Sequence, residues 1–501
     1  MRIVAALALV AAAAAAVPAR ADEIPPVEQI VARARAAAAA DRRPGLERET
    51  WAVRAHALEG TEISVRRGND VSSMLMLGPF HTARGIAGGT RWHQNENGQT
   101  VVDGADAGPE RVVAQSVARA RDPAGALVVT SGYESGHVGK TYYDARTMLV
   151  VRSEKLAAGR TAWTAFDDFR SDARGRTRAW HVTGGAERGQ RDYDYRLLRD
   201  DVPPAVAPEL VAAPPDRRLL FAFPEGTDSA RLPARVEAGR IYVRLHIAGR
   251  GLDFLLDSGA SNITIDGDVA RELGLPRYGR TRQTVAGTFI AERAIASDVT
   301  VGPLVAQDLV MHTGPLAHRE GSHTRVVGLL GYDFIAALGL RIDYANGTVD
   351  AFRPGTLRVP DTALPIGVRL SGEVPVASAV VGGALGEDFI VDTGAQFGLV
   401  VFQRFARAHS GAITIDESAP PRTGTAVGGT LQYRPITSRR IELGPFRLDR
   451  ADEVEAVSPA ALGFDDRDGL VGSELLRRFT VYLDYAAHRI FLTPTTRSSH
   501  P

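Results

Sequence analysis

The stretch DFLLDSGA at residues 253–260 decides the fold, because it recurs as DFIVDTGA at residues 388–395, 135 positions further on. Four later segments repeat in the same order at offsets of 141 or 142: AGT at 286–288 with GGT at 428–430, GP at 302–303 with GP at 444–445, GLLG at 328–331 with GLVG at 469–472, and LRIDY at 340–344 with VYLDY at 481–485. Collinear matches with so little drift predict a duplicated domain.

Each copy is rich in short runs of Val, Ile, Leu and Phe that are punctuated by Gly and Pro, which is typical of β-strands. Short helical patterns are seen only at residues 269–273 and near residues 402–408. We therefore predict a mainly β protein that contains two duplicated β-barrel-like lobes, residues 235–358 and 359–495, of roughly 120 residues each.

In each copy an aspartate, Asp257 or Asp392, follows three apolar strand residues and precedes a small hydroxyl residue and a glycine. A strand that ends in such a turn presents its carboxylate at a loop tip, and the glycine lets a second backbone approach closely. One such turn is weak evidence for catalysis, since Asp-Ser-Gly and Asp-Thr-Gly are common surface turns. Two of them in duplicated lobes make a shared carboxylate site the better interpretation.

These motifs resemble those of the retropepsin-like aspartic proteases, particularly bacterial relatives in which two lobes are fused in one chain. The similarity covers about residues 235–494 and rests on the two Asp-hydroxyl-Gly-Ala motifs and the later GLLG and GLVG segments. The resemblance implies that Asp257 and Asp392, one from each lobe, form a catalytic dyad that shares a proton and activates water, without metal, cofactor or covalent intermediate. It also implies that Ser258, Gly259, Thr393 and Gly394 support the dyad.

Position alone assigns two possible flaps, residues 284–290 with Gly287 and Thr288, and residues 425–433 with Gly428 and Gly429. Their glycines allow hinge motion over the site, although an ordinary hairpin accounts for each segment equally well. Asp343 and Asp484 also recur, but in late strands, where a structural role is the commoner one.

The sequence departs from the family pattern in two ways. Ala260 and Ala395 stand where pepsin-like enzymes usually carry a hydroxyl that favours ionisation of the dyad, so we expect activity at mildly acidic to neutral pH. Gln396 stands where Ser or Thr is more usual, and this asymmetry leaves it open whether the second lobe has drifted toward shaping the substrate site.

The region before the repeats has a different composition. Residues 1–21 combine Arg2, an apolar run over 3–17 and an Ala-Arg-Ala end, which predicts a cleaved signal peptide and a periplasmic or secreted protein; the run is short for a membrane anchor. Residues 22–199 predict one helix near residues 25–40 and an antiparallel β domain, and the proline-rich residues 200–234 predict a linker.

The β domain is faintly similar to the curved half-barrels of periplasmic lipoprotein-sorting proteins, through Gly-Thr-Arg-Trp at residues 89–92 before the Asn97-Gly98 turn. That similarity implies a curved antiparallel sheet and a lipid or an extended peptide as a possible ligand. An inhibitory segment and a plain structural partner remain equally open roles for this domain.

Composition excludes several other chemistries. The 501 residues include no Cys, so there is no disulfide, thiolate metal site or cysteine nucleophile, and 59 acidic residues balance 59 basic ones, which argues against nucleic acid as a partner. His312, His318 and His323 lie near Glu320, but an unpatterned cluster of this kind is more often an exposed loop than a metal site.

We therefore predict an aspartic endopeptidase that acts on peptides or proteins and requires no cofactor. A non-catalytic periplasmic protein that binds a peptide or lipid on a protease-like scaffold is the alternative. A glycosidase pair is a third possibility, but it requires the two carboxylates to lie about 5 Å or more apart.

Overall fold

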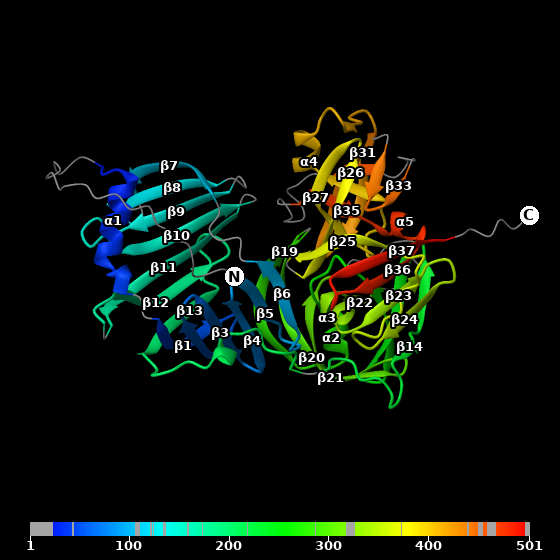
Figure 1. Cartoon of the computed structure of the whole chain (residues 1–501), viewed down its shortest axis with the longest axis horizontal. Helices are drawn as coiled ribbons and strands as arrows, with labels where there is room; N and C mark the ends of the chain where they lie inside the picture. Colours follow the sequence, from blue (N-terminus) through cyan, green and yellow to red (C-terminus); the bar gives the residue numbers. More distant parts are fainter. Residues whose placement is uncertain are drawn as a thin grey trace, which may run out of the picture. The chain divides into compact units, whose positions relative to one another are not determined.

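The computed structural model describes residues 24–495 except for 43–44, 106–110, 121–122, 124, 134–136, 158–159, 173, 218, 286, 317–325, 372, 438–439, 449–453 and 458–466. The chain forms two compact units (Figure 1). Unit 1 contains the residues up to Asn95 and Val102–Pro215, and unit 2 contains Glu96–Val101 and the residues from Asp216 onward. The signal peptide predicted for residues 1–21 lies outside the described residues.

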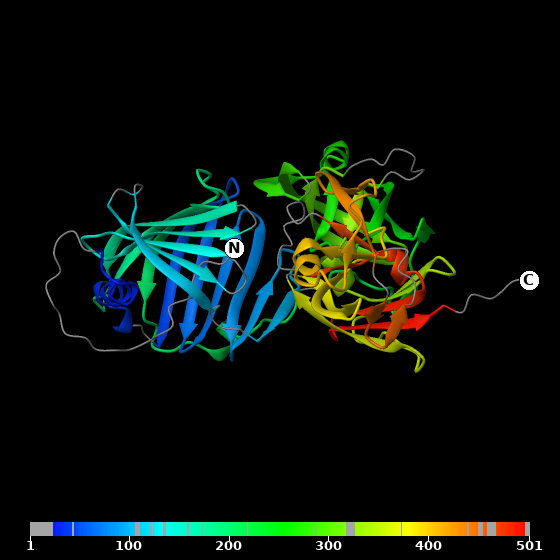
Figure 2. The ribbon, with the colours of Figure 1, turned by 90° about the horizontal axis from the view of Figure 1, so that it is seen from above.

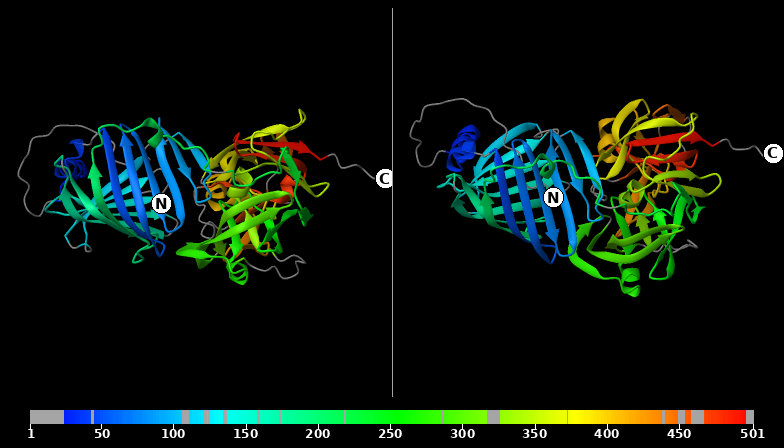
Figure 3. Two further views of the ribbon diagram at one scale, coloured as in Figure 1. Left: turned by 90° about the horizontal axis from the view of Figure 1, so that it is seen from below. Right: turned by 60° about the horizontal axis from the view of Figure 1, so that its bottom comes forward.

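Unit 1 is built on one 13-stranded sheet with the order β6-β5-β4-β3-β2-β1-β13-β12-β11-β10-β9-β8-β7. Two meanders, β1 to β6 and β7 to β13, join where β1 pairs antiparallel with β13. The sheet is strongly curved (Figures 2 and 3). The strands are β1 (Leu46–Ala55), β2 (Leu58–Arg67), β3 (Asp70–Leu77), β4 (Phe80–Ala87), β5 (Thr90–Gln94), β6 (Thr100–Ala105), β7 (Val112–Arg119), β8 (Leu127–Tyr133), β9 (Val138–Tyr143), β10 (Val150–Ala157), β11 (Arg160–Ser171), β12 (Thr177–Gly185) and β13 (Tyr193–Asp201).

The helix expected near residues 25–40 is α1 (Val27–Ala37), and a short 3-10 turn, η1 (Ala40–Arg42), follows it. Ile30 and Ala34 are four residues apart and therefore lie on one face of α1, where they are buried against Leu127, Val129 and Tyr143 of the sheet. This apolar stripe accounts for the position of the helix on β8 and β9. Within the described residues, no helix is long and apolar enough to cross a membrane.

Unit 2 contains two lobes of similar construction. Lobe 1 is an eight-stranded sheet with the order β15-β16-β17-β22-β18-β21-β20-β19, and β16 also pairs with β20. Its elements are β15 (Ala234–Glu237), β16 (Arg240–Ile247), β17 (Arg250–Leu256), β18 (Ile263–Asp266), α2 (Gly267–Glu272), β19 (Arg277–Thr284), β20 (Thr288–Val301), β21 (Leu304–Gly314), β22 (Gly328–Leu330) and α3 (Tyr332–Ala336).

Lobe 2 repeats this plan from β26 to α5. Its elements are β26 (Val374–Val381), β27 (Ala384–Val391), β28 (Leu399–Phe402), α4 (Gln403–Ala408), β29 (Thr414–Ile415), β30 (Arg422–Ala426), β31 (Gly429–Thr437), β32 (Ile441–Leu443), β33 (Phe446–Leu448), β34 (Val454–Val457), β35 (Gly469–Val471) and α5 (Ser473–Leu476).

Six strands join the lobes in the order β14-β24-β23-β36-β37-β25, and they lie side by side in Figure 1. The two central strands contain the repeated LRIDY and VYLDY segments, and they pair antiparallel with Ile342 opposite Val481. Equivalent parts of the two copies therefore meet at the centre of unit 2. The bounds are β14 (Ser229–Arg231), β23 (Gly339–Asp343), β24 (Thr348–Phe352), β25 (Leu364–Ser371), β36 (Phe479–Asp484) and β37 (Arg489–Pro494).

The mainly β fold agrees with the prediction from the sequence. The statement that helical patterns occur only near residues 269–273 and 402–408 is wrong, because α3 and α5 were not anticipated. Both are only four or five residues long and mostly buried, so they carry no amphipathic period that a pattern could reveal.

The segment expected to be a linker, residues 200–234, is more structured than its seven prolines suggest. It contains η2 (Pro208–Leu210) and β14, and Leu220, Phe221 and Phe223 are buried in the core of unit 2. Prolines mark where regular strands end, but apolar residues between them can still be buried in a core.

Candidate active site

The same strand arrangement places Asp257 and Asp392 in their respective lobes. In lobe 1, β17 runs parallel to β22, and the backbone N–H of Asp257 donates to the carbonyl of Leu330 at 3.0 Å. In lobe 2, β27 runs parallel to β35, and the N–H of Asp392 donates to the carbonyl of Val471 at 2.9 Å. Each aspartate is thus held at the end of a strand by the apolar-apolar-Gly segment of its own copy.

The glycines that end those segments have a steric reason. A Cβ on Gly331 would lie 2.4 Å from the carbonyl oxygens of Ala260 and Asn262, and one on Gly472 would lie 2.2 Å from the carbonyl oxygen of Phe397. Any side chain at these two positions would push away the loop that carries the aspartate.

The structure brings the two aspartates together. A Cβ on Gly259 would lie 2.6 Å from the Asp392 carboxyl carbon, and a Cβ on Gly394 would lie 2.5 Å from the Asp257 carboxyl carbon. The two carboxyl groups form a hydrogen bond with each other. Both residues are partly buried.

Ser258 and Thr393 join the two loops by reciprocal hydrogen bonds. The Ser258 N–H donates to the Thr393 hydroxyl at 3.1 Å, and the Thr393 N–H donates to the Ser258 hydroxyl at 2.9 Å. The hydroxyls then donate to the carbonyls of Val391 and Leu256 in the opposite lobe, at 2.6 and 2.8 Å. Ser258 is 1 % exposed and Thr393 is fully buried, so water does not compete for these bonds.

The surroundings of the aspartates raise the pKa of both carboxyls. Burial raises the pKa of Asp257 well above its usual value, and the negative charge of Asp392 and the hydrogen bond with it raise it further. Burial also raises the pKa of Asp392, but the N–H groups of Gly394 and Ala395 donate to its Oδ1 at 2.8 and 3.0 Å and oppose the rise.

These hydrogen bonds divide the roles of the two carboxyls. Asp257 Oδ1 accepts one backbone N–H, that of Gly259 at 3.0 Å, whereas Asp392 accepts two. Because N–H donors stabilise a carboxylate, the pair holds its shared proton on Asp257 and its negative charge on Asp392.

Two tyrosines beside the dyad were not recognised from the sequence, although they end the repeated LRIDY and VYLDY segments. Tyr344 and Tyr485 are buried, and neither hydroxyl makes a hydrogen bond of normal geometry among the described residues. Burial raises the pKa of each phenol, and the negative charge of Asp392 raises it further. Both therefore remain neutral next to the carboxyls.

Arg240 is a further residue near the dyad that was not recognised from the sequence. Its positive charge lowers the pKa of both aspartates.

The two segments predicted as flaps are hairpins whose tips touch. The β19–β20 hairpin turns at Gly287, and the β30–β31 hairpin turns at Gly428, which has a φ of 83°. A Cβ on Gly287 would lie 2.2 Å from the Gly428 carbonyl oxygen, so this contact requires glycine. Thr288 and Gly429 begin β20 and β31 and hold the turns as the first residues of the returning strands. Whether the hairpins act as flaps stays a prediction.

Of the residues considered for a metal site, His312 is described, whereas His318, Glu320 and His323 lie outside the described residues. His312 Nε2 forms a 3.2 Å contact with Glu96, which also pairs with Arg293.

In unit 1, Glu47, Glu49 and Asp200 are close enough together for a cation, but Arg176 and Arg178 already neutralise them. Asp343 accepts hydrogen bonds from Asn346 in a turn, as a structural residue does.

A family model described as aspartyl protease matches residues 243–334, which include Asp257 and the GLLG segment. The chain is also similar to the crystal structures of basic 7S globulin from soybean (10 % identity, TM-score 0.35, covering 53 % of this chain and 96 % of that one) and of aspartic proteinase from Irpex lacteus (14 % identity, TM-score 0.34, covering 54 % and 98 %). No curated protein matches the chain. The family match supports a relation to the pepsin-like and retropepsin-like aspartic proteases.

Proposed function

We propose that this protein is an aspartic endopeptidase whose catalytic dyad is Asp257 and Asp392. One observation carries the proposal: two Asp-hydroxyl-Gly turns from different lobes meet, with their carboxyl groups hydrogen-bonded and their hydroxyls reciprocally bonded. The aspartyl protease match at residues 243–334 supports the same class of chemistry and a peptide or protein substrate.

The proposed reaction uses one ionised and one protonated carboxyl. The Asp392 carboxylate removes a proton from a water molecule, whose oxygen attacks the carbonyl carbon of the scissile peptide bond, while Asp257 gives its proton to the carbonyl oxygen. The Asp257 carboxylate then takes a proton from one hydroxyl of the tetrahedral diol as the C–N bond breaks, and the leaving nitrogen takes the proton that Asp392 holds. The products are a carboxylic acid and an amine, and the protonation state of the pair is restored.

The hydrogen bond between the carboxyls also disfavours the glycosidase alternative. A retaining glycosidase holds its two carboxyl groups about 5 Å apart, and an inverting one holds them further apart. Groups in hydrogen-bond contact leave no room for a sugar carbon between them.

The test compares Asp257→Asn and Asp392→Asn with the matched controls Asp253→Asn and Asp388→Asn, which lie four residues earlier in each motif. Cleavage of a peptide mixture by the purified mature chain is followed by mass spectrometry. We expect each dyad variant to lose on the order of 10²–10⁴-fold or more in kcat/KM, and each control to stay within a few fold of the parent.

Full activity in both dyad variants would contradict the dyad. No cleavage by the parent protein, together with tight binding of peptides, would favour the non-catalytic scaffold. The signal peptide predicted for residues 1–21 supports the further proposal that the protease acts in the periplasm or outside the cell.

A further inference from the structure

Arg240 is the first residue of β16, and its positive charge acts on both aspartates of the dyad. It follows the two-residue turn between β15 and β16, where Glu237 pairs with Arg240. The antiparallel register of β16 and β17 ends with Tyr242 opposite Leu255, and its extension by two residues would place Arg240 opposite Asp257. Opposite residues of an antiparallel pair point to the same face of a sheet. The arginine therefore shares the face of the dyad.

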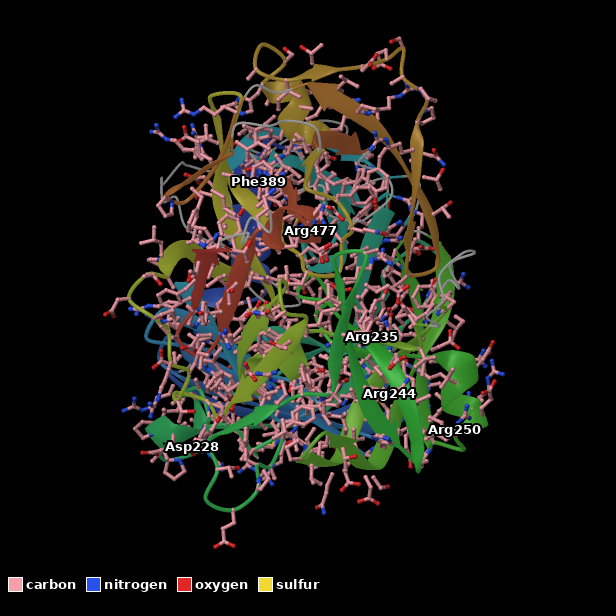
Figure 4. All side chains as sticks on the ribbon, turned by 90° about the vertical axis from the view of Figure 1, so that its right-hand side faces the viewer. Asp228, Arg235, Arg244, Arg250, Phe389 and Arg477 are labelled. Atoms are coloured by element: carbon pink, nitrogen blue, oxygen red, sulfur yellow. The ribbon has the colours of Figure 1, made fainter. Side chains whose placement is uncertain are left out.

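The guanidinium of Arg240 has no ion-pair partner among the described residues, and its buried Nε makes no hydrogen bond. Neighbouring arginines of the same hairpin are different. Arg244 binds Asp253 with two hydrogen bonds, at 2.9 and 3.0 Å, and Arg235 binds Asp253 and Glu237. Figure 4 labels Arg235 and Arg244 on this hairpin. A buried donor on a cation is costly to leave unpaired, so an unpaired one beside a catalytic pair points to a ligand.

Lobe 2 fixes the turn that carries Arg240. The side-chain amide of Gln396 donates to the Ala238 carbonyl at 3.2 Å, which gives a structural role to the unusual residue of the second motif. Gly239, with a φ of 77°, packs against α5, where Glu474 is already paired with Arg477 at 2.5 Å. Glu474 is therefore already paired with another arginine. The turn before Arg240 is held by Gln396 on one side and packs against α5 on the other.

The equivalent position of lobe 2 carries an apolar residue. Ser371 pairs with Val374 across the hairpin as Glu237 pairs with Arg240, and the register of β26 and β27 extends to place Val374 opposite Asp392. Val374 is 3 % exposed and packs in a cluster with Val376, Ile390 and Phe402. The two sides of the dyad therefore differ, one being cationic and the other apolar.

We propose that Arg240 is a specificity-determining residue that binds an acidic side chain of the substrate on one side of the scissile bond. The inference rests on the proposed function, because it assigns a substrate class to the same site. A carboxylate of Asp or Glu is the ligand that a guanidinium binds with paired, charge-assisted hydrogen bonds. The Val374 side offers no such partner, so the acidic preference belongs to one side only.

The experiment first determines the cleavage sites of the parent protein in a proteome-derived peptide library. The best substrate is then synthesised as a pair that differs only by Glu or Gln at the enriched position. We expect roughly tenfold or greater kcat/KM for the Glu peptide, in line with a charge-assisted hydrogen bond. In Arg240→Gln the ratio should fall to about one, and in Arg240→Glu a Lys peptide should become the better substrate.

The matched control is Arg244→Gln, which removes the same charge from the same strand but leaves the Glu-to-Gln ratio unchanged. An arginine that only tuned the dyad would change the rates for both peptides equally, so an unchanged ratio in Arg240→Gln overturns the proposal. Absence of acidic enrichment in the parent library also overturns it, and that result does not depend on how any variant folds.

Binding measurements separate this inference from the proposed function. A peptide that the parent protein captures is synthesised in two forms, one with Glu and one with Gln at the same position. The affinities of the parent protein and of Arg240→Gln for both forms are then measured by calorimetry. If the parent binds the Glu peptide more tightly without cleaving it, and Arg240→Gln does not, then catalysis fails while the role of Arg240 stands. If the parent protein cleaves peptides without a preference for Glu over Gln, the proposed function stands and the role of Arg240 fails.

Discussion

Ser258 and Thr393, 135 residues apart in the chain, each donate a backbone N–H to the hydroxyl of the other. Each hydroxyl in turn donates a hydrogen bond to a backbone carbonyl of the opposite lobe, so four buried hydrogen bonds connect the two aspartate loops. The precision of the dyad therefore depends on residues that perform no chemistry.

Loss of one of these hydroxyls is expected to loosen the site. Thr393→Val leaves the Ser258 N–H and the Leu256 carbonyl unpaired in a dry environment, which should cost about 2–4 kcal/mol of unfolding free energy and lower kcat. Thr393→Ser keeps the hydroxyl and is the matched control. Denaturant unfolding and peptide cleavage measure the two effects, and equal behaviour of the Val and Ser variants would contradict the bracing role.

A methyl group added at Gly394, against the Asp257 carboxyl, is expected to slow turnover strongly. Gly394→Ala places a Cβ 2.5 Å from the Asp257 carboxyl carbon, so the pair must separate, and a displacement near 1 Å costs roughly 100-fold in rate. Gly367→Ala in β25 is the control, because nothing lies within 4 Å of its Cβ. Wild-type kcat in Gly394→Ala would show that the two carboxyls need not stay in contact.

Removal of Arg240 is expected to move the pH–rate profile to higher pH. Its positive charge lowers the pKa of both carboxyls, so Arg240→Gln raises both. The active state has one proton shared by the pair. The acidic limb, where the pair loses its first proton, and the alkaline limb, where it loses the second, should therefore both shift upward. Arg244→Gln should leave both limbs in place, and a downward shift in Arg240→Gln would be incompatible with this electrostatic arrangement.

Asp333 is expected to make unit 2 less stable as the pH rises. Burial, together with the negative charge of Glu373, raises its pKa to about 7, while the Ile263 N–H donates to its Oδ2 at 3.1 Å and Glu96 and His312 lie within electrostatic range. Because the folded pKa exceeds the unfolded value of about 3.9, its stabilising contribution is complete below about pH 4 and is lost by about pH 7.

The difference between these two pKa values corresponds to about 4 kcal/mol at most over that interval. Asp333→Asn keeps an acceptor for the Ile263 N–H but does not titrate, so its unfolding free energy should fall less between pH 4.5 and 7.5 than that of the parent. Denaturant titrations at several pH values measure this slope. Identical slopes in the two proteins would show that Asp333 does not titrate in this range.

Contact between the hairpin tips is expected to depend on Gly287. Gly287→Ala places a Cβ 2.2 Å from the Gly428 carbonyl oxygen, which forces the tips apart. If the hairpins are flaps, KM should rise severalfold while the unfolding free energy stays nearly constant, because the tips lie outside the core. An unchanged KM would favour ordinary hairpins.

The sequence by itself determined the motif strands and the two aspartates at their ends. The repeat identified Asp257 and Asp392, and the glycines of GLLG and GLVG identified the close backbone contacts behind them. These features can be predicted because strand alternation, tight turns and steric exclusion are local or recur at a fixed spacing. The helices α3 and α5 were missed because four or five buried residues carry no periodic signal.

Only the tertiary structure decided what stands around the dyad. Pairing of β23 with β36 brings the two copies together, and the first strand of the motif hairpin begins with Arg240 in lobe 1 but with Val374 in lobe 2. Neither residue belongs to a repeated motif, so no pattern in the chain connects it with the aspartates. The physical reason is that burial, charge and hydrogen bonding at this site depend on distances between lobes, and those distances exist only after both lobes have folded against each other.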